Sequence, residues 1–238
     1  MKLKPGLLYL LAFFSLVFFI HEIHDWAHVI AAKFYCKYWG SRAFDIWAPS
    51  PVCKITTTQL AFCSLAGPVV NYIFLWMGWS LLSPQNELDR RTLGFSLVFA
   101  ALPFPRLLAA AKGGGDETTG LHQLFPHVES GHIHTIALIG LGIVTLLCLP
   151  PLIRAFLFLP GWVRKVVIFP AFLVIPGLVD QWLVHDMLNK LIVKNMFIEE
   201  QIPGIPLIVF GWFILLSFLC LFTFGRLYTL FEHKDLPL

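Results

Sequence analysis

The sequence predicts an all-α integral membrane protein: a bundle of about six transmembrane helices with a membrane-embedded or interfacial loop or hairpin after the first helix. Of the 238 residues, 58% are hydrophobic and only 13% are charged, whereas soluble domains carry about 25% charged residues. The apolar residues also gather in runs of the ~20 residues that cross a bilayer as a helix. A water-soluble fold of this size would lack the charged groups to cover its surface.

The length rule places six candidate helices, at residues 7–32, 59–83, 92–111, 133–153, 163–185 and 206–230. Prolines interrupt the third (Pro103, Pro105) and the fifth (Pro170, Pro176). Membranes tolerate such helices where neighbouring protein satisfies the freed carbonyl groups. No internal repeat or low-complexity segment divides the chain, so we expect one transmembrane domain over residues 1–238.

The N-terminal run has the lysines and apolar residues of a signal peptide, but no small-residue cleavage site follows it. It continues directly into a polar cluster around His24, and we therefore expect a retained helix. The later connections 33–58 and 112–132 are longer than a turn. The first contains Trp39 and Trp47, which favours an interfacial loop or short strands at headgroup depth. The second is rich in glycine and histidine.

The basic residues indicate neither a nucleic-acid partner nor an orientation. The net charge is only +3, and no basic stripe is present. The 17 Lys and Arg residues divide nine to eight between the two sides of the predicted bundle, and the positive-inside rule needs a larger bias.

The five cysteines form no CxxC pair and no metal-ligand spacing. Cys63, Cys148 and Cys220 lie inside apolar runs, as small buried hydrophobic residues do. Cys36 and Cys53 flank one loop and would pair only in an oxidising compartment. We expect these two to be free thiols as well.

The first predicted helix carries five ionisable residues within eight positions: His21, Glu22, His24, Asp25 and His28. Each such group near the bilayer centre costs on the order of 2.5–3.5 kcal/mol, so a functional role is the default expectation. A position just beyond the membrane edge would explain the charges, but not three histidines. The cluster therefore indicates a metal site.

His24 and His28 are four residues apart and lie one above the other on a helix face. This is how the HExxH pattern holds zinc, with the glutamate as base. Here that position is Asp25, which is one methylene shorter and can also serve as a base. Glu22 flanks Asp25, so either carboxylate could be the base while the other orients an imidazole. His21 lies on the same face and could support a ligand or replace one.

The segment His24-Asp25-Trp26-Ala27-His28-Val-Ile-Ala-Ala resembles the HExxH-x-x-x-A segment of the site-2 protease family of intramembrane zinc metallopeptidases, with HDxxH in place of HExxH. Ala66-Gly67-Pro68-Val69-Val70-Asn71 resembles the A-G-P-x-x-N element that opens the family's next core helix. Leu102–Pro105 followed by Gly115-Asp116 resembles the place of the family's third ligand, although the usual N-P and L-D-G are absent. Residues 33–58 correspond to the family's membrane-embedded hairpin.

The resemblance covers residues 15–120, which implies a catalytic core over 1–120 and additional helices over 121–238. It implies hydrolysis of peptide bonds in transmembrane segments of membrane proteins, within the lipid bilayer of a bacterial inner or plasma membrane. It also implies one Zn²⁺ per chain, held by His24, His28 and Asp116, with water at the open position.

The resemblance also implies residues that accept a proton and residues that bind the substrate. Asp25 or Glu22 would take a proton from the water. Asn71, with Gly67 and Pro68, would hold the extended substrate. Asn71 could instead donate to the oxyanion, or bond a neighbouring helix.

Three alternatives stay open. A membrane di-iron oxygenase of the desaturase or hydroxylase type would use histidine clusters drawn from residues 21, 24, 28, 122, 127, 132, 134 and 185. A metal-ion transporter would add Asp180 or His185 to the same site, with Gln181 and Asp186 nearby. Because Asp25 replaces the usual glutamate, the chain could also be an inactive protease homologue.

Overall fold

The computed structural model describes residues 2–126, 133–193, 200–202 and 204–232. Within these residues six helices are long and apolar enough to cross a membrane, so the predicted membrane bundle is confirmed. The six spans are Leu7–Cys36, Thr57–Leu81, Leu88–Ala111, His134–Phe158, Trp162–Ile192 and Leu207–Tyr228.

The α-helices are α1 (Leu7–Cys36), α2 (Thr57–Leu81), α3 (Leu88–Ala100), α4 (Pro103–Ala111), α5 (Gly115–Leu124), α6 (Ile133–Phe158), α7 (Trp162–Asp180), α8 (Asn189–Val193) and α9 (Leu207–Thr223). A π-helical segment, Gln181–Leu188, joins α7 to α8, and a 3-10 turn, Phe224–Tyr228, follows α9. The strands are β1 (Lys2–Leu3), β2 (Ser41–Arg42), β3 (Trp47–Ala48), β4 (Glu200–Ile202), β5 (Ile205–Pro206) and β6 (Phe231–Glu232). They form three antiparallel pairs, β1–β6, β2–β3 and β4–β5.

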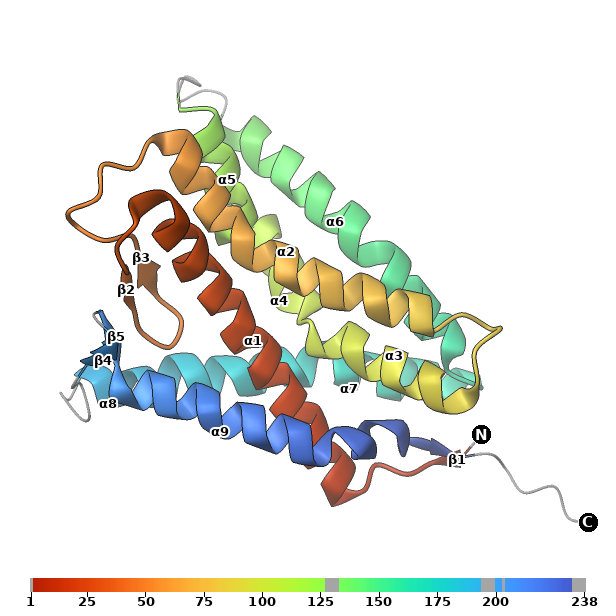
Figure 1. Ribbon diagram of the computed structural model, residues 1–238. Helices are drawn as coiled ribbons and strands as arrows, with labels where there is room; N and C mark the ends of the chain where they lie inside the picture. Colours follow the sequence, from red (N-terminus) through yellow and green to blue (C-terminus); the bar gives the residue numbers. More distant parts are fainter. Residues whose placement is uncertain (1, 127–132, 194–199, 203, 233–238) are drawn as a thin grey trace, which may run out of the picture.

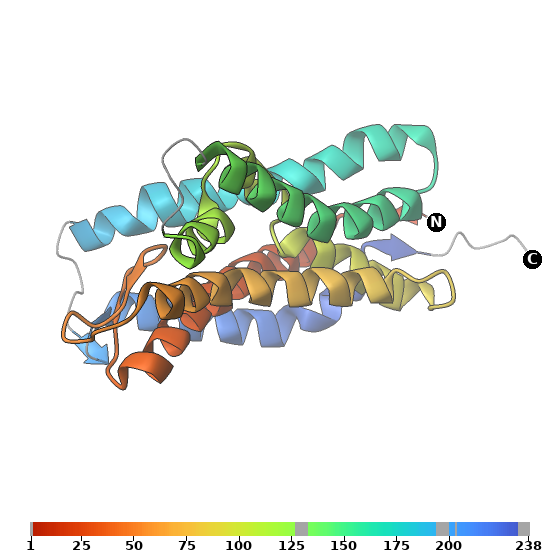
Figure 2. The ribbon, with the colours of Figure 1, turned by 90° about the horizontal axis from the view of Figure 1, so that it is seen from above.

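Helix α1 is the central element of the bundle. It packs against α2 on one side and α9 on the other (Figure 1). Seen from above, α6 and α7 run along one side of the bundle, and α1, α2 and α9 along the other (Figure 2). The apolar window of α1 is 56% buried inside the protein, as against 11% for the fifth span. The polar cluster of α1 is therefore shielded from lipid by other helices.

The third span is broken in the middle. Helix α3 ends at Ala100 and α4 begins at Pro103, because Leu102 between them takes a left-handed backbone conformation with φ of 54°. Proline is well tolerated at the first position of a helix, where its missing N–H would have no partner. Helix α4 then lies beside α5 and α6 instead of continuing α3 (Figure 1).

Two glycines allow α3 to lie directly on α2. A Cβ atom added at Gly78 would lie 2.7 Å from the carbonyl oxygen of Gly94, and one added at Gly94 would lie 2.7 Å from the oxygen of Gly78. Small residues commonly permit such backbone contact between membrane helices. Asn71 adds a hydrogen bond from Nδ2 to the carbonyl oxygen of Ala101, at 3.1 Å. The break in the third span is thereby fixed to α2.

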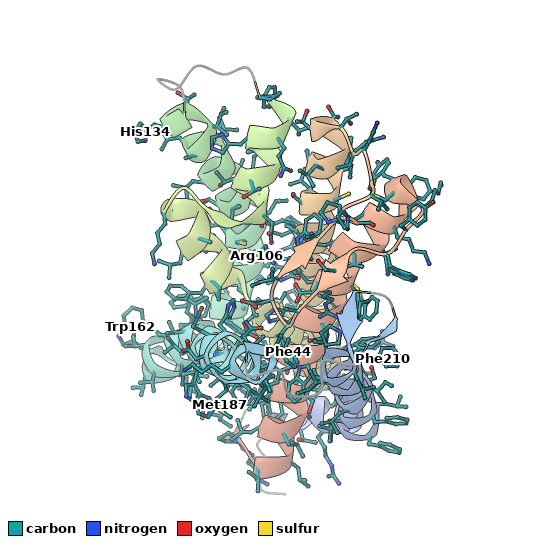
Figure 3. All side chains as sticks on the ribbon, turned by 90° about the vertical axis from the view of Figure 1, so that its left-hand side faces the viewer. Phe44, Arg106, His134, Trp162, Met187 and Phe210 are labelled. Carbon is teal, nitrogen blue, oxygen red and sulfur yellow. A yellow bond between two sulfur atoms is a disulfide. The ribbon has the colours of Figure 1, made fainter. Side chains whose placement is uncertain are left out.

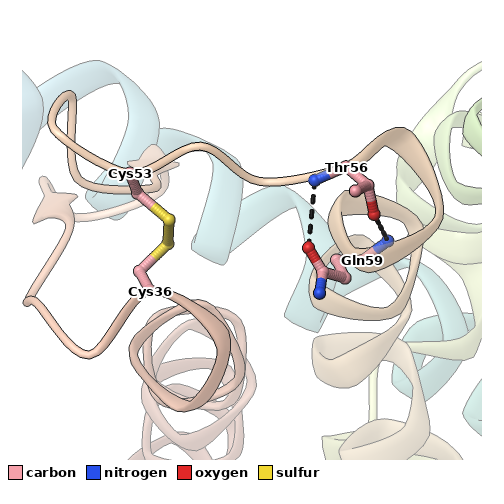
Figure 4. Close-up of a disulfide and its surroundings, with 4 residues drawn as sticks. All are labelled: Cys36, Cys53, Thr56 and Gln59. Carbon is pink, nitrogen blue, oxygen red and sulfur yellow. Dashed lines mark hydrogen bonds between the residues drawn. A yellow bond between two sulfur atoms is a disulfide. The ribbon is translucent and has the colours of Figure 1, made fainter.

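The predicted loop or hairpin after the first helix is the β2–β3 hairpin, which pairs Ser41 with Ala48 and Arg42 with Trp47. A disulfide between Cys36 and Cys53 joins the end of α1 to the chain before α2 (Figure 4). The expectation of free thiols was wrong, because the fold brings the two Cα atoms to 5.3 Å, within the range of a disulfide.

Helix α2 begins with a reciprocal cap just beyond this disulfide (Figure 4). The backbone N–H of Gln59 donates to the Thr56 hydroxyl at 3.2 Å, and that of Thr56 donates to the Gln59 side chain at 3.0 Å. Two N–H groups at the start of the helix are thus satisfied. The cap fixes where the connection ends and the second span begins.

Residues 112–132 are not merely a connection, since they contain α5. Gly113 and Gly115 have φ of 73° and 85°, a conformation that favours glycine, and they turn the chain sharply from α4 into α5. The glycines that suggested a loop therefore form a tight turn before a helix. Of the histidines that an oxygenase would use, His122 lies on α5 and His134 lies just beyond this segment, in α6. His127 and His132 lie outside the described residues.

Candidate metal centre

The two predicted zinc-binding histidines present their imidazoles to a common point. Nε2 of His24 lies 3.1 Å from Nε2 of His28. Oδ2 of Asp116, on the first turn of α5, lies 3.2 Å from the first of these nitrogens and 3.7 Å from the second. Tetrahedral zinc with bonds of about 2.0–2.1 Å separates neighbouring ligand atoms by about 3.3 Å. The three atoms thus lie at the mutual spacing that one such ion requires.

Helix α2 fixes the orientation of the His28 ring. Nδ1 of His28 donates to the carbonyl oxygen of Cys63 at 2.7 Å, which leaves the lone pair of Nε2 directed at the candidate site. The ring also stacks on Trp47 of the hairpin, with centroids 4.8 Å apart. A Cβ atom at Gly67 would overlap both ligand imidazoles. Glycine at this position therefore lets α2 approach the two histidines.

Asp116 reaches the site through the turn at Gly113 and Gly115. Its side chain is 35% exposed, and the partial positive charge at the start of α5 favours a carboxylate there. Burial by itself would raise the pKa of the Asp116 carboxyl, but its contacts with the imidazoles and with the guanidinium of Arg106 hold that pKa well below its usual range. The side chain is thus an anion that could bind a cation.

The two candidate bases have different surroundings. Glu22 accepts a hydrogen bond from Nη2 of Arg42 at 2.6 Å, and neither side chain is exposed by more than 2%. Asp25 lies 3.4 Å from the same Nη2, while its other oxygen lies 4.0 Å from Nε2 of His24. Asp25 lines the cavity in front of the imidazoles, and Glu22 does not. With His24 and His28, Asp25 forms a buried group whose ligand atoms lie within 4.8 Å of one another, so this group could hold a metal ion.

The cavity has a volume of about 270 Å³ and extends from the ligand triangle to the fifth span. Along it, Nδ1 of His21 lies 2.6 Å from Asp180 and Nε2 lies 3.6 Å from Asp25. Its remaining lining residues include Asp45, Trp47, Asn71, Leu102 and His185. His21 thus connects the candidate base to the fifth span, and is engaged by two carboxylates.

The hairpin turn and the fifth span meet at the far end of the cavity. Asp45 is bound by both His185 and Asn189. Burial by itself would raise the pKa of Asp45, but these hydrogen bonds and the charge of His185 lower it. Phe44 beside it is fully buried against Val184 and neighbouring apolar residues. The turn is therefore anchored to the fifth span by polar and apolar contacts together.

Arg106 also belongs to the site, although the sequence did not point to it. Its Nη1 donates to Asp116 at 3.0 Å and lies 3.4 Å from Glu117, while its Nη2 lies 2.8 Å from Nδ1 and 3.0 Å from Nε2 of His24. Figure 3 shows Arg106 well inside the molecule, whereas Trp162 lies at its margin. Glu117 is in turn held by the Tyr72 hydroxyl at 2.7 Å.

Around the candidate site, acidic side chains outnumber arginines. Arg42 faces Glu22 and Asp25, and Arg106 faces Asp116 and Glu117. When all are ionised, four carboxylates meet two guanidinium groups. A divalent ion would neutralise the excess, and a bundle of membrane-spanning helices favours neutrality because isolated charges are costly there. Geometry and charge therefore both fit a divalent cation.

The three residues predicted to bind substrate, Gly67, Pro68 and Asn71, lie on α2, where Gly67 packs against the two imidazoles of α1. Gly67 and Pro68 are buried, and Asn71 lines the cavity. The Nδ2 group of Asn71 is used by the carbonyl of Ala101, while its buried Oδ1 has no hydrogen-bond partner in the described residues. Asn71 thus offers an acceptor to the cavity and not the donor that an oxyanion needs.

No family model, no curated protein and no solved structure matches the chain. The fold and the cavity define a class: a multi-pass α-helical membrane protein with a buried cluster that could hold a metal ion. The geometry of that cluster is therefore what indicates a function.

Proposed function

We propose that this chain is a zinc-dependent intramembrane protease of the site-2 protease type, which hydrolyses peptide bonds in the transmembrane segments of other membrane proteins. The observation that supports this most is the triangle of His24 Nε2, His28 Nε2 and Asp116 Oδ2, with sides of 3.1, 3.2 and 3.7 Å. In a catalytic zinc site of this kind, water takes the fourth tetrahedral position. One ion per chain is the expected content.

Zinc bound there would lower the pKa of a coordinated water and polarise a substrate carbonyl. Asp25 is the proposed base, because its carboxylate lines the cavity and Glu22 does not. Asp25 would accept the proton of the water and return it to the leaving amine. Glu22 is a positioning residue: together with Asp25 it binds Arg42, and so keeps the Asp25 carboxylate beside the site.

The polar lining suggests how a substrate strand is held. The free acceptor of Asn71 could take a backbone N–H of an extended peptide. Trp47 and Leu102 supply apolar surface in the cavity. A transmembrane helix exposes its backbone groups only when it unwinds, so this acceptor would favour a locally extended substrate.

One observation favours metal transport as a second candidate. Transport requires Asp180 or His185 beside the same site, and both line the cavity. Each is however bound to another side chain, Asp180 to His21 and His185 to Asp45. An oxygenase is less well supported, since among the described residues only His21, His24, His28 and His185 line the cavity. Two irons usually require more histidines.

Metal analysis and peptidase assays test the proposal together. We expect about one zinc per chain in the detergent-purified wild type, and its loss in His24→Ala and in Asp116→Ala. His122→Ala is the matched control, because this histidine lies on α5 with Asp116 but not at the cavity. The zinc-loaded wild type should cut a reconstituted transmembrane peptide into fragments that mass spectrometry identifies. Two irons per chain, or Zn²⁺ flux in proteoliposomes without cleavage, would replace this proposal with an oxygenase or a transporter.

A further inference from the structure

Arg106 is held at the candidate metal site by contacts that leave one end of its guanidinium for a ligand. Nη1 is occupied by Asp116 and Glu117, at 3.0 and 3.4 Å. Glu117 is 4% exposed and not part of the ligand triangle, so it anchors the guanidinium independently of a metal. Nη2 contacts only the two ring nitrogens of His24 among the described hydrogen-bond partners.

That contact cannot persist when His24 is a metal ligand. A neutral imidazole has one acceptor nitrogen and one N–H. If Nε2 is used as the ligand, Nδ1 carries the proton and can no longer accept from Nη2. The N–H groups of Nη2 are then left facing a cavity that Arg106 itself lines, and a buried cationic donor without an acceptor is costly.

We propose that Arg106 binds the substrate carbonyl oxygen at the metal centre and stabilises the negative charge that develops on it. This inference depends on the proposed metal site and adds a catalytic residue to it. A preorganised donor of this kind contributes about 10²–10³ in kcat. Any small carboxylate bound at the same centre would meet the same Nη2 group, which provides a measurement separate from activity.

The test uses cobalt-loaded protein, whose visible absorption reports the metal's surroundings, and acetate as the probe. We expect acetate to bind about 10- to 100-fold more weakly to Arg106→Gln than to the wild type, because a hydrogen bond to a charged group is lost. Arg106→Lys should be intermediate, since it keeps the charge but not the planar fork. Cobalt content must be equal in all three proteins, and peptidase activity should fall in kcat more than in KM.

The outcomes separate this inference from the proposed function. Equal acetate affinity in wild type and Arg106→Gln, at equal cobalt content, would overturn the role of Arg106 and leave the metal site intact. If the wild type took up no cobalt while Arg106→Gln did, the guanidinium would itself be the resident cation. That result would overturn the protease proposal along with the inference.

A separate set of observations concerns the orientation of the bundle. The Cys36–Cys53 disulfide lies at the end that holds the β2–β3 hairpin, and β1 and β6 pair at the opposite end (Figure 1). Disulfides persist in oxidising compartments and are rare in reducing ones. The cavity is lined by Asp45 and Trp47 of the hairpin and by Asp116 of α5, so it belongs to the disulfide end.

The basic residues are distributed almost evenly between the two ends. In the described ranges, eight lie toward the β1–β6 end: Lys2, Lys4, Arg90, Arg91, Arg154, Arg164, Lys165 and Arg226. Seven lie toward the disulfide end: Lys33, Lys37, Arg42, Lys54, Arg106, Lys112 and Lys190. Two of these seven, Arg42 and Arg106, are turned inward against carboxylates, with side-chain exposures of 0% and 14%. The positive-inside rule counts Lys and Arg whether or not acidic groups are nearby, so the described residues stand at eight to seven and favour neither orientation.

We infer from the disulfide that the hairpin end, and with it the cavity, faces the oxidising compartment and that the β1–β6 end faces the reducing one. Substrates would then be cut in the half of their transmembrane segment nearest the oxidising side. This orientation does not depend on the chemistry of the site.

Full-length fusions and thiol labelling test the orientation. We expect a green fluorescent protein fused after Leu238 to fluoresce, and an alkaline phosphatase fused there to be inactive, because the phosphatase needs an oxidising compartment. On intact cells, an impermeant maleimide should label Cys36 and Cys53 only after reduction, with Cys36→Ser/Cys53→Ser as the unlabelled control. An active phosphatase fusion, or labelling of Cys36 and Cys53 that needs permeabilised cells even after reduction, would overturn the inference.

Discussion

Glu22 and Arg42 form an ion pair in which Nη2 and Oε2 are 2.6 Å apart, with both side chains inside the protein. The pair joins α1 to the hairpin. The Nε and Nη1 groups of the same guanidinium have no hydrogen-bond partner in the described residues, while its Cζ lies 5.2 Å from the Trp26 ring. Glu22 and Asp25 are therefore the groups that balance the buried positive charge of Arg42.

Breaking this pair from either side should destabilise the fold. Glu22→Leu leaves a buried cation, and Arg42→Leu leaves buried carboxylates, a loss of about 3–5 kcal/mol each for a buried pair. The double variant should be more stable than the sum of the single losses predicts, since both charges are removed together. Thermal unfolding of the detergent-purified proteins measures all three, with exposed Arg90→Leu as control. Additive losses would contradict the coupling.

Asp25 should be the residue on which activity depends. Asp25→Asn removes the basic oxygen with almost no change in shape, so peptidase activity should fall by about 10²–10⁴ while zinc is retained. Asp25→Glu restores the carboxylate, and should keep more activity than the amide. Glu22→Gln is the comparison: loss of all activity there at full zinc content, with Asp25→Asn active, would transfer the role of base to Glu22.

Gly67→Ala should prevent metal binding at the candidate site. The added Cβ would overlap the imidazoles of His24 and His28, so α2 or the two rings must move by more than metal coordination allows. We expect zinc content to fall well below one per chain. Gly142→Ala is the matched control, because it is also a glycine in a membrane helix but has no atom within 4 Å of the added Cβ. Full zinc in Gly67→Ala would show that the imidazoles are not packed as described.

The sequence predicts the spans and the histidine pair because both depend on local patterns. Apolar runs of bilayer length define the six helices, and a spacing of four places His24 and His28 on one face. The helix ends are less accurate: α1 continues to Cys36, beyond the predicted end at residue 32. A long helix at a membrane edge need not stop where apolar residues stop.

What the sequence could not predict depends on contacts between distant residues. Arg106 lies 82 positions from His24 and 10 from Asp116, so no spacing rule joins them. A lone arginine in the third apolar run was a usable signal, since charges in spans are functional by default. The 17-residue separation of Cys36 and Cys53 carries no such signal. Their pairing follows only from the fold of the hairpin between them.

The disulfide should hold the hairpin against the cavity, and its removal is the last change we would test. Closing a loop of 17 residues restricts the unfolded chain by about 3 kcal/mol, so Cys36→Ser/Cys53→Ser should unfold at a lower temperature than the wild type. Because Trp47 stacks on His28, the variant should also release zinc faster to a chelator. Wild type with reductant should match the double variant, and buried Cys220→Ser should not show faster zinc release. A double variant with unchanged zinc release would mean that the contacts of Phe44 and Asp45 with the fifth span anchor the hairpin by themselves.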